Sequence, residues 1–168
     1  KDGNIVRNPI RPLMLNLDEL PFPDREMVDY QKLIEKESDR NVKVMATRGC
    51  LYECTYCVNK HIRGVYPNPQ DWYRMRSPEN VIAELKYLKE NYKFDHVGFH
   101  DDNITIRLDW LKKFLELYKK EINVKFYCAS RVERCTDEVL DLLRDSGCFM
   151  ILIGVESGNE KFRKLMLN

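Results

Sequence analysis

The sequence predicts an α/β fold, namely a partial (β/α) barrel of parallel strands with about four β/α units, preceded by an extended arm. Strand-like and helix-like segments alternate along the chain in the order strand, loop, helix, and this order favours parallel strands joined by helical crossovers. Each expected strand also ends in a polar cluster, and such clusters gather at the carboxyl ends of parallel strands. Four strands are half of an eight-stranded barrel, which needs about 250 residues. We therefore expect that the sheet stays open or continues outside these 168 residues.

The first 41 residues are expected to form an arm, or connector between domains, that contains one short helix. Prolines and turn-forming pairs within residues 1–23 discourage regular structure, so this part is expected to be extended. Apolar residues at helical spacing within Asp24–Glu37 predict the short helix. The core domain is then expected to cover residues 42–168.

The core domain is expected to contain four strands and four helices. Alternating β-branched and apolar residues predict strands at 42–47, 96–100, 124–128 and 149–155. Start and stop signals and apolar periodicity predict helices from Ser77, over Leu108–Glu121, from Thr136 to Gly147 and from Asn159 onward. The Ser77-Pro78-Glu79 stretch combines a capping hydroxyl, a proline at the first helical position and an acid in the first turn.

Composition and charge limit the class of protein. The chain is 43% hydrophobic and 33% charged, as in globular domains, and 28 basic residues against 27 acidic ones give no electrostatic reason to expect nucleic acid as a partner. The longest apolar run, Cys148–Val155, is far shorter than the ~20 residues that span a bilayer, and no signal peptide opens the chain. We therefore expect a cytoplasmic protein without a membrane partner.

Three of the six cysteines, Cys50, Cys54 and Cys57, lie in one short loop at CxxxCxxC spacing. Six cysteines are too few for a disulfide scaffold, and a tight cluster in a reducing compartment indicates a metal site. Three soft sulfur ligands without a fourth leave one coordination position open, which favours an iron–sulfur cluster that takes part in chemistry.

Two other interpretations of the loop stay open. A structural zinc site with His61 as fourth ligand is one, although closed zinc sites usually pair two CxxC-like elements. A redox dithiol of Cys54 and Cys57 is the other, although it leaves Cys50 unexplained. The remaining cysteines, Cys128, Cys135 and Cys148, are expected to be small buried or surface residues.

The cysteines, with Tyr56 directly before the last of them, resemble the CxxxCxxC motif of the radical S-adenosylmethionine (radical SAM) enzymes. Other stretches resemble the cobalamin-associated branch of that superfamily: Leu17-Asp18-Glu19-Leu20-Pro21-Phe22-Pro23, Thr47-Arg48-Gly49-Cys50, Arg76-Ser77-Pro78-Glu79, Asp101-Asp102-Asn103 and Gly154-Val155-Glu156-Ser157-Gly158. The resemblance covers nearly the whole chain. It implies the N-terminal part of the radical SAM partial TIM barrel, preceded by a connector from a cobalamin-binding domain.

The resemblance also implies cofactors and a reaction. Cys50, Cys54 and Cys57 would hold a 4Fe-4S cluster whose unique iron is chelated by S-adenosylmethionine, and one electron would cleave this molecule to methionine and a 5'-deoxyadenosyl radical. The parent protein would be a cobalamin-dependent methyltransferase or a rearrangement or cyclisation enzyme. It would act on a small-molecule substrate and receive electrons from a reductant such as flavodoxin or ferredoxin. A non-catalytic iron–sulfur or zinc module and an inactive fragment are the alternatives.

The resemblance assigns further residues to S-adenosylmethionine. Asp101 and Asp102 stand where the family usually has a glycine-glycine-glutamate element for the methionine amino group, and the sequence departs from that pattern. For either aspartate, capping of the following helix or turn is the alternative. Ser130 and Arg131, at the third strand end, are also expected to bind S-adenosylmethionine. Arg131 is suited to pair with the methionine carboxylate through two parallel hydrogen bonds. A surface ion pair with Glu133 is the alternative for Arg131.

Two residues complete the expected set. Glu156 is expected against the ribose or the amino acid part of S-adenosylmethionine, and Tyr56 beside its adenine, with packing of the loop as the alternative for Tyr56. His100 stays outside the catalytic set because a lone histidine at a strand end is more often structural. An open half-barrel exposes two strand edges, so we expect the chain alone to self-associate or to hold its cysteine loop in partial disorder.

Overall fold

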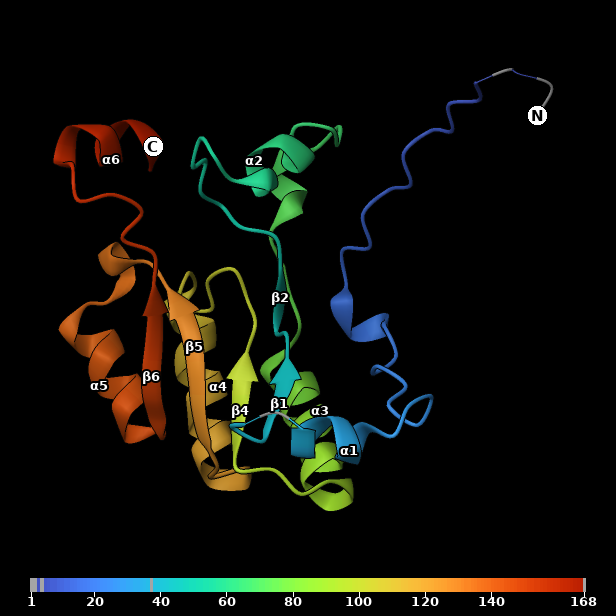
Figure 1. Ribbon diagram of the computed structural model, residues 1–168, viewed down its shortest axis with the longest axis vertical. Coiled ribbons are helices and arrows are strands. Elements are labelled where there is room, and N and C mark those ends of the chain that lie inside the picture. Colours follow the sequence, from blue (N-terminus) through green and yellow to red (C-terminus); the bar gives the residue numbers. More distant parts are fainter. Residues whose placement is uncertain (1–2, 4, 37, 168) are drawn as a thin grey trace.

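A four-stranded parallel sheet forms the centre of the structure, a computed structural model that describes residues 3, 5–36 and 38–167 (Figure 1). Its strand order is β1-β4-β5-β6, and all three pairings are parallel. The four strands are β1 (Asn41–Val44), β4 (His96–Phe99), β5 (Lys125–Ser130) and β6 (Cys148–Ile153). The prediction of an α/β fold with about four β/α units behind an extended arm is confirmed.

Helical crossovers connect the strands, as the order of segments predicts. They are α3 (Pro78–Asn91), α4 (Leu108–Glu121) and α5 (Asp137–Asp145), and α6 (Glu160–Met166) follows β6. The capping signals act as expected, because the hydroxyl of Ser77 accepts from the amide of Asn80 and that of Thr136 accepts from the amide of Val139. Gly147 follows α5 with a φ of 93°, a left-handed conformation that glycine adopts without strain.

The hydrophobic core lies between the sheet and these crossover helices. Alternate strand residues belong to it, namely Val42, Val44, Val97, Phe99, Phe126 and Cys128. The ring of Phe99 is the centre, because it meets Phe114 of α4 and Phe126 of β5 edge to face, with centroids 5.4 and 5.5 Å apart. The intervening residues face away from the core, so Lys43 and His100 remain exposed on the other side of the sheet.

The first strand is shorter than predicted. β1 ends at Val44, and Thr47–Arg48 forms a separate strand, β2, that pairs antiparallel with β3 (Arg74–Met75). The sequence signals did not reveal β3 or the short helix α2 (Val58–Arg63). Figure 1 shows α2 and the cysteine loop raised beyond the end of β1, with the β2–β3 ladder at their base.

The arm runs along the side of the molecule that carries β1 and α3 (Figure 1). Residues 5–29 contain one 3₁₀ helix, η1 (Leu17–Glu19), and the predicted short helix is α1 (Tyr30–Lys36). Glu37, the last residue of the predicted helix, lies outside the described residues, as do Lys1, Asp2, Asn4 and Asn168 at the ends of the expected domains. Two further 3₁₀ helices are Pro69–Trp72 and Val132–Arg134.

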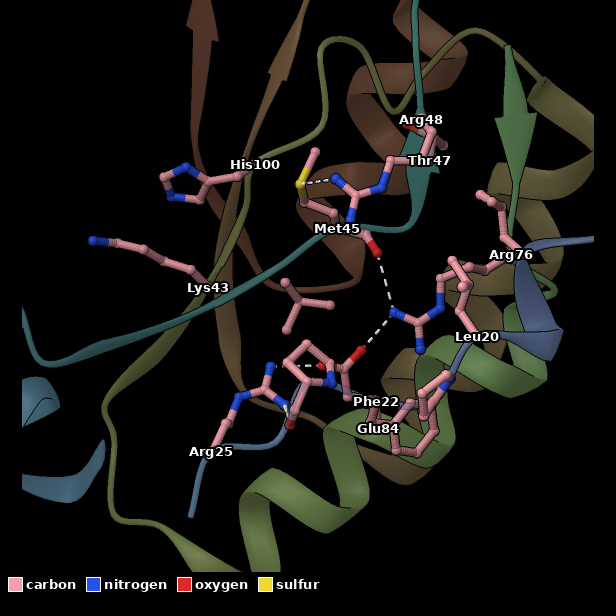
Figure 2. Close-up of a pocket in the computed structure, with 14 residues that line it drawn as sticks. Leu20, Phe22, Arg25, Lys43, Met45, Thr47, Arg48, Arg76, Glu84 and His100 are labelled. Atoms are coloured by element: carbon pink, nitrogen blue, oxygen red, sulfur yellow. Dashed lines mark hydrogen bonds and ion pairs between the residues drawn. The ribbon is translucent and has the colours of Figure 1, made fainter. Parts of the chain in front are cut away.

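Buried polar contacts hold the arm against α3. Asp18 Oδ1 accepts a hydrogen bond from the amide of Ser77 at 2.9 Å, and Arg25 Nη2 lies 2.6 Å from Glu84 Oε1. Arg76 Nη1 approaches the other carboxylate oxygen of Glu84 at 2.5 Å (Figure 2). Because Glu84 is 1% exposed, its charge depends on these two guanidinium groups for compensation.

The two edges of the sheet differ. The arm lies near β1, whereas β6 exposes apolar side chains, including Phe149, Met150, Leu152 and Ile153. The structure describes the whole cysteine loop, and self-association through the edges stays a prediction. Among the described residues, no helix has the length and apolar character that crossing a bilayer requires.

Glu84→Ala should lower the free energy of unfolding by about 3–5 kcal/mol, because it leaves the buried guanidinium of Arg25, and that of Arg76, without its carboxylate. Urea unfolding followed by circular dichroism measures the change. Lys112→Ala removes an exposed ion pair with Glu138 and should cost about 1 kcal/mol or less. Equal losses in the two variants would show that the triad does not hold the arm.

Candidate functional site

A cavity of about 420 Å³ opens where the cysteine loop meets the carboxyl ends of β5 and β6. The loop, the segment after β4 and the segments that follow β5 and β6 all supply walls. Eight of the residues expected from the sequence line it, namely Cys50, Cys54, Tyr56, Cys57, Asp102, Ser130, Arg131 and Glu156. Asp101, the ninth, lies elsewhere. The strand ends therefore converge on the cysteine loop as the parallel topology predicts.

Gly49 fixes the start of the cysteine loop. Its φ is 80°, a left-handed conformation, and a Cβ at this position would lie 2.5 Å from the carbonyl oxygen of Trp72. Gly49 follows β2 and Trp72 precedes β3, so the two ends of the segment between these strands pack directly against each other. Only glycine meets both demands directly before Cys50.

Asn59 connects three parts of the site. Its Nδ2 donates to Asp102 Oδ2 at 3.1 Å and lies 3.7 Å from Cys57 Sγ, while its Oδ1 accepts from Trp72 Nε1 at 2.9 Å. The side chain is buried, so these partners satisfy polar groups that water does not reach. Asn59 thereby holds Asp102 in the cavity wall.

Arg131 reaches into the cavity toward the cysteines. Its Nη1 donates to Cys54 Sγ at 2.9 Å, and its guanidinium carbon lies 4.0 Å from the centre of the Tyr52 ring. The ion pair with Glu133 is also present, at 3.2 Å, so the alternative interpretation holds alongside the pocket position. Nη2 donates to the carbonyl of Leu167 at 3.3 Å.

Tyr56 and Glu156 lie next to each other in the wall of the cavity. The pKa of the Tyr56 hydroxyl is raised above its ordinary value. The larger cause is partial burial, and the second is a hydrogen bond to Glu156. Glu156 has a φ of 61°, which is uncommon for a residue with a side chain and costs roughly 1–2 kcal/mol. Strain of this kind gathers at functional sites, where the surrounding structure maintains it.

Ser130, the last residue of β5, also lines the cavity. Its hydroxyl is 2.6 Å from the hydroxyl of Thr105, which also hydrogen-bonds to Asn103 Oδ1 at 2.8 Å. Ser130 is 5% exposed, so this hydroxyl mainly joins the end of β5 to the segment after β4.

Helix α6 closes one side of the site. The amide of Thr55, between Cys54 and Cys57, donates to the carbonyl of Met166 at 2.9 Å, and Leu167 lines the cavity. Figure 1 shows α6 at the same end of the sheet as α2.

Asp101 lies beneath the site instead of in it. Oδ1 accepts from the amide of Thr47 at 2.5 Å and from its hydroxyl at 2.6 Å, and both carboxylate oxygens accept from the amide of Ala46. Asp101 is 3% exposed, and burial raises its pKa from 3.8 to about 6 against the effect of these hydrogen bonds. Asp101 therefore fastens the end of β4 to the turn from which the cysteine loop leaves the sheet.

A family model described as the Radical SAM superfamily matches residues 44–167. The chain belongs to this superfamily. The match runs from the last residue of β1 through α6 and includes the cysteine loop together with every residue that lines the cavity.

Several curated relatives resemble the radical SAM chain along most of its length. An uncharacterized methyltransferase of Pyrococcus horikoshii is 27% identical over 96% of the chain, and the cytidylyl-2-hydroxyethylphosphonate methyltransferase of Streptomyces wedmorensis is 26% identical over 95%. The tRNA-2-methylthio-N(6)-dimethylallyladenosine synthase of Clostridium botulinum is 29% identical over 79%. The matched regions are 34%, 30% and 30% of these proteins, so the chain spans about a third of their length.

The donor atoms of the radical SAM site suit an iron–sulfur cluster. Three free thiols lie in the wall of one cavity, while among the described residues no three histidine, cysteine or acidic side chains converge on a point that one ion could occupy. A cluster takes each thiolate at a different iron atom, so its ligands need not meet at one point. Burial raises the pKa of the Cys50 thiol, and metal binding must therefore displace a proton there.

Contacts to the sulfur atoms also fit this use. Arg131 donates to Cys54 Sγ, Asn59 lies near Cys57 Sγ, and hydrogen bonds to cysteine sulfur tune the potential of a cluster. By contrast, His61, the proposed zinc ligand, is exposed on α2 and does not line the cavity. Of the remaining cysteines, Cys128 is a buried core residue, whereas Cys135 and Cys148 are half-buried.

Sequence reasoning missed Gly49, Asn59 and Trp72, although they shape the cysteine loop. Gly49 stands inside the quoted Thr47-Arg48-Gly49-Cys50 stretch, and a glycine before a metal-binding cysteine was the available signal. For Asn59 and Trp72 no local pattern existed, because their roles depend on a contact across 13 residues.

Asp101 should make the stability of the domain depend on pH. The pKa of this carboxyl is about 6 in the folded state and 3.8 in the unfolded state. Its contribution to stability is therefore fully present below pH 3.8, and it is lost as the pH rises through 6. Relative to Asp101→Asn, which does not titrate, the wild-type free energy of unfolding should fall by about 2 kcal/mol between pH 4 and pH 7. Urea unfolding at several pH values measures it, with Asp141→Asn as the exposed control. A difference that does not change with pH would disprove the assignment.

Proposed function

We propose that the chain is the catalytic domain of a radical SAM enzyme that cleaves S-adenosylmethionine reductively. One observation carries the proposal: all three cysteines of the CxxxCxxC loop line the same cavity as Asp102, Arg131 and Glu156. Sulfur ligands with an open position, two acids and a guanidinium in one cavity match the needs of a zwitterionic ligand held beside a cluster.

In this proposal each residue of the cavity has a separate task. Cys50, Cys54 and Cys57 would hold a 4Fe-4S cluster, which supplies the electron that cleaves S-adenosylmethionine to methionine and a 5'-deoxyadenosyl radical. Asp102 would bind the methionine amino group, because it lines the cavity, whereas the oxygens of Asp101 are engaged by Ala46 and Thr47.

The other polar groups would orient the ligand. Arg131 would bind the methionine carboxylate, and its contact with Cys54 Sγ already places it beside the cluster position. Glu156 would contact the ribose or the amino acid part, Tyr56 would lie beside the adenine, and Ser130 would hold the end of β5 in place.

For the whole protein we propose a cobalamin-dependent methyltransferase, or an enzyme of rearrangement or cyclisation, that acts on a small molecule. The names of the relatives from Pyrococcus horikoshii and Streptomyces wedmorensis support methyl transfer. Cobalamin would be bound mainly by a separate domain before the arm. Electrons would come from a carrier such as flavodoxin or ferredoxin, and free cysteines suit a cytoplasmic location.

The central test is formation of 5'-deoxyadenosine by full-length protein that has been reconstituted anaerobically with iron and sulfide and then given dithionite and S-adenosylmethionine. Wild type should produce it, and Cys54→Ala should fall to background because a cluster ligand is lost. Cys148→Ala is the matched control, since Cys148 begins β6 at the opposite end of the strand. Zinc in place of iron and sulfide, or no product from wild type, would favour a structural or electron-carrying module.

Arg131→Lys should raise the KM for S-adenosylmethionine about tenfold or more, because an ammonium cannot replace the two parallel hydrogen bonds of a guanidinium to a carboxylate. Initial rates at varied S-adenosylmethionine concentration measure it, at equal iron content. Arg144→Lys, on the exposed face of α5, should leave KM unchanged. An unchanged KM in Arg131→Lys would remove Arg131 from the binding set.

A further inference from the structure

Arg131 supplies the positive charge for a carboxylate in the cavity beside the cysteine loop. Among the described residues that line this cavity, it alone is basic, whereas Asp102, Glu133 and Glu156 are acidic. The proposed function places the carboxylate of methionine on Arg131, and a buried anion without a cationic partner is strongly disfavoured. The groups that already contact the Arg131 guanidinium therefore decide how a ligand carboxylate binds.

A guanidinium can hold a carboxylate through two parallel hydrogen bonds at either of two edges, and both edges of Arg131 have partners in the protein. At the edge formed by Nη1 and Nη2, Nη1 donates to Cys54 Sγ at 2.9 Å and Nη2 donates to the carbonyl of Leu167 at 3.3 Å. At the edge formed by Nε and Nη2, Nε donates to Glu133 Oε2 at 3.2 Å and Nη2 donates to Oε1 at 3.3 Å. Glu133 therefore contacts Arg131 in the geometry that a ligand carboxylate would use.

Of these partners, Glu133 is the one that can leave at little cost. Its side chain is 54% exposed, whereas that of Arg131 is 17% exposed, so the Glu133 carboxylate can rotate into water. Exposed ion pairs of this kind contribute little to stability. By contrast, Cys54 is buried and the acceptor of Leu167 is a backbone carbonyl, so neither partner leaves without a change in the fold.

The guanidinium of Arg131 keeps its place without Glu133. Tyr52 packs against its face, with the centre of the ring 4.0 Å from the guanidinium carbon. Tyr52 is held in turn by Arg134, whose Nε donates to the Tyr52 hydroxyl at 2.7 Å. The contact with Cys54 Sγ fixes the guanidinium from the side of the cysteine loop. A carboxylate that enters the cavity therefore meets a guanidinium that is already oriented.

Two carboxylates cannot share the same edge of Arg131. Both would need the hydrogens of Nε and Nη2, and two negative charges at this distance repel each other. The pKa of Glu133 is lowered, first of all by its hydrogen bond with Arg131, so Glu133 is ionised at neutral pH. A ligand carboxylate has to break the Glu133 pair before it binds, and its apparent affinity is lower by the fraction of molecules in which the pair is formed.

We propose that Glu133 is a built-in competitor for the carboxylate of S-adenosylmethionine. Its side chain holds the edge of Arg131 formed by Nε and Nη2, and it gives up this edge to the methionine carboxylate when the ligand binds. The identity of the ligand rests on the proposed function. In this role Glu133 sets the affinity for molecules that carry a carboxylate, namely S-adenosylmethionine and methionine. It does not affect 5'-deoxyadenosine, which carries none.

Equilibrium dialysis of S-adenosylmethionine against full-length, reconstituted protein tests the competition, and omission of the reductant keeps the ligand intact. Glu133→Gln removes the charge and keeps the size of the side chain. It should lower the Kd about two- to fivefold, the range that an exposed ion pair is worth. Glu138→Gln is the matched control, because this side chain is 53% exposed, pairs with Lys112 and lies outside the cavity, so the Kd should not change. 5'-Deoxyadenosine should bind equally to wild type and Glu133→Gln.

A gain of affinity separates this role from damage to the fold, which weakens binding. An equal or higher Kd in Glu133→Gln would overturn the proposal, and so would the same gain for 5'-deoxyadenosine. Because dialysis does not involve cleavage, tighter binding without formation of 5'-deoxyadenosine would disprove the proposed function and leave the role of Glu133 in place. Cleavage with an unchanged Kd would do the reverse, and absence of binding to both proteins would disprove both proposals.

Discussion

The site depends on the buried carboxylate of Asp101. By accepting from the amides of Ala46 and Thr47, it stops β1 from continuing and turns the chain out of the sheet toward Gly49 and Cys50. Where the chain leaves the sheet inside the core, its backbone amides lose their strand partners and need another hydrogen-bond acceptor. A carboxylate oxygen is the strongest acceptor that a side chain offers. The desolvation of this group is the cost of fixing the cysteine loop to the strand beside it.

The sequence patterns predicted the scaffold well and the loops poorly. Strands and crossover helices depend on local periodicity and capping, so Ser77, Thr136 and Gly147 could be assigned their positions from the sequence alone. β3 has two residues and exists because β2 lies beside it, which no local pattern reveals. The choice between Asp101 and Asp102 was equally hidden, since neighbouring residues at a strand end point in different directions and only packing decides which is buried.

The Leu17-to-Pro23 stretch of the arm and the Arg76-to-Glu79 stretch at the start of α3 are far apart in the sequence but contact each other in the structure. The Leu17-to-Pro23 stretch gives Asp18, which accepts from the amide of Ser77 at the start of α3, and Arg76 beside it meets Glu84 together with Arg25. Any other position of the arm would leave the buried carboxylate of Glu84 without one of its two guanidinium partners. These contacts fix the position of the arm on the core. Between the two lies a cavity of about 360 Å³ that is lined by Phe22 of the arm and His100 of the core, among others.

The hydrogen bond between Thr55 and Met166 joins residues that are 111 positions apart. The cysteine loop follows the first strand of the sheet, yet its residue Thr55 is held by α6, the helix that follows the last strand. Because Met166 follows β6, the loop can acquire its full set of contacts only after the fourth strand of the sheet and the helix behind it have docked. The order of the cysteine loop therefore depends on the far end of the described chain as well as on the strand from which the loop leaves the sheet.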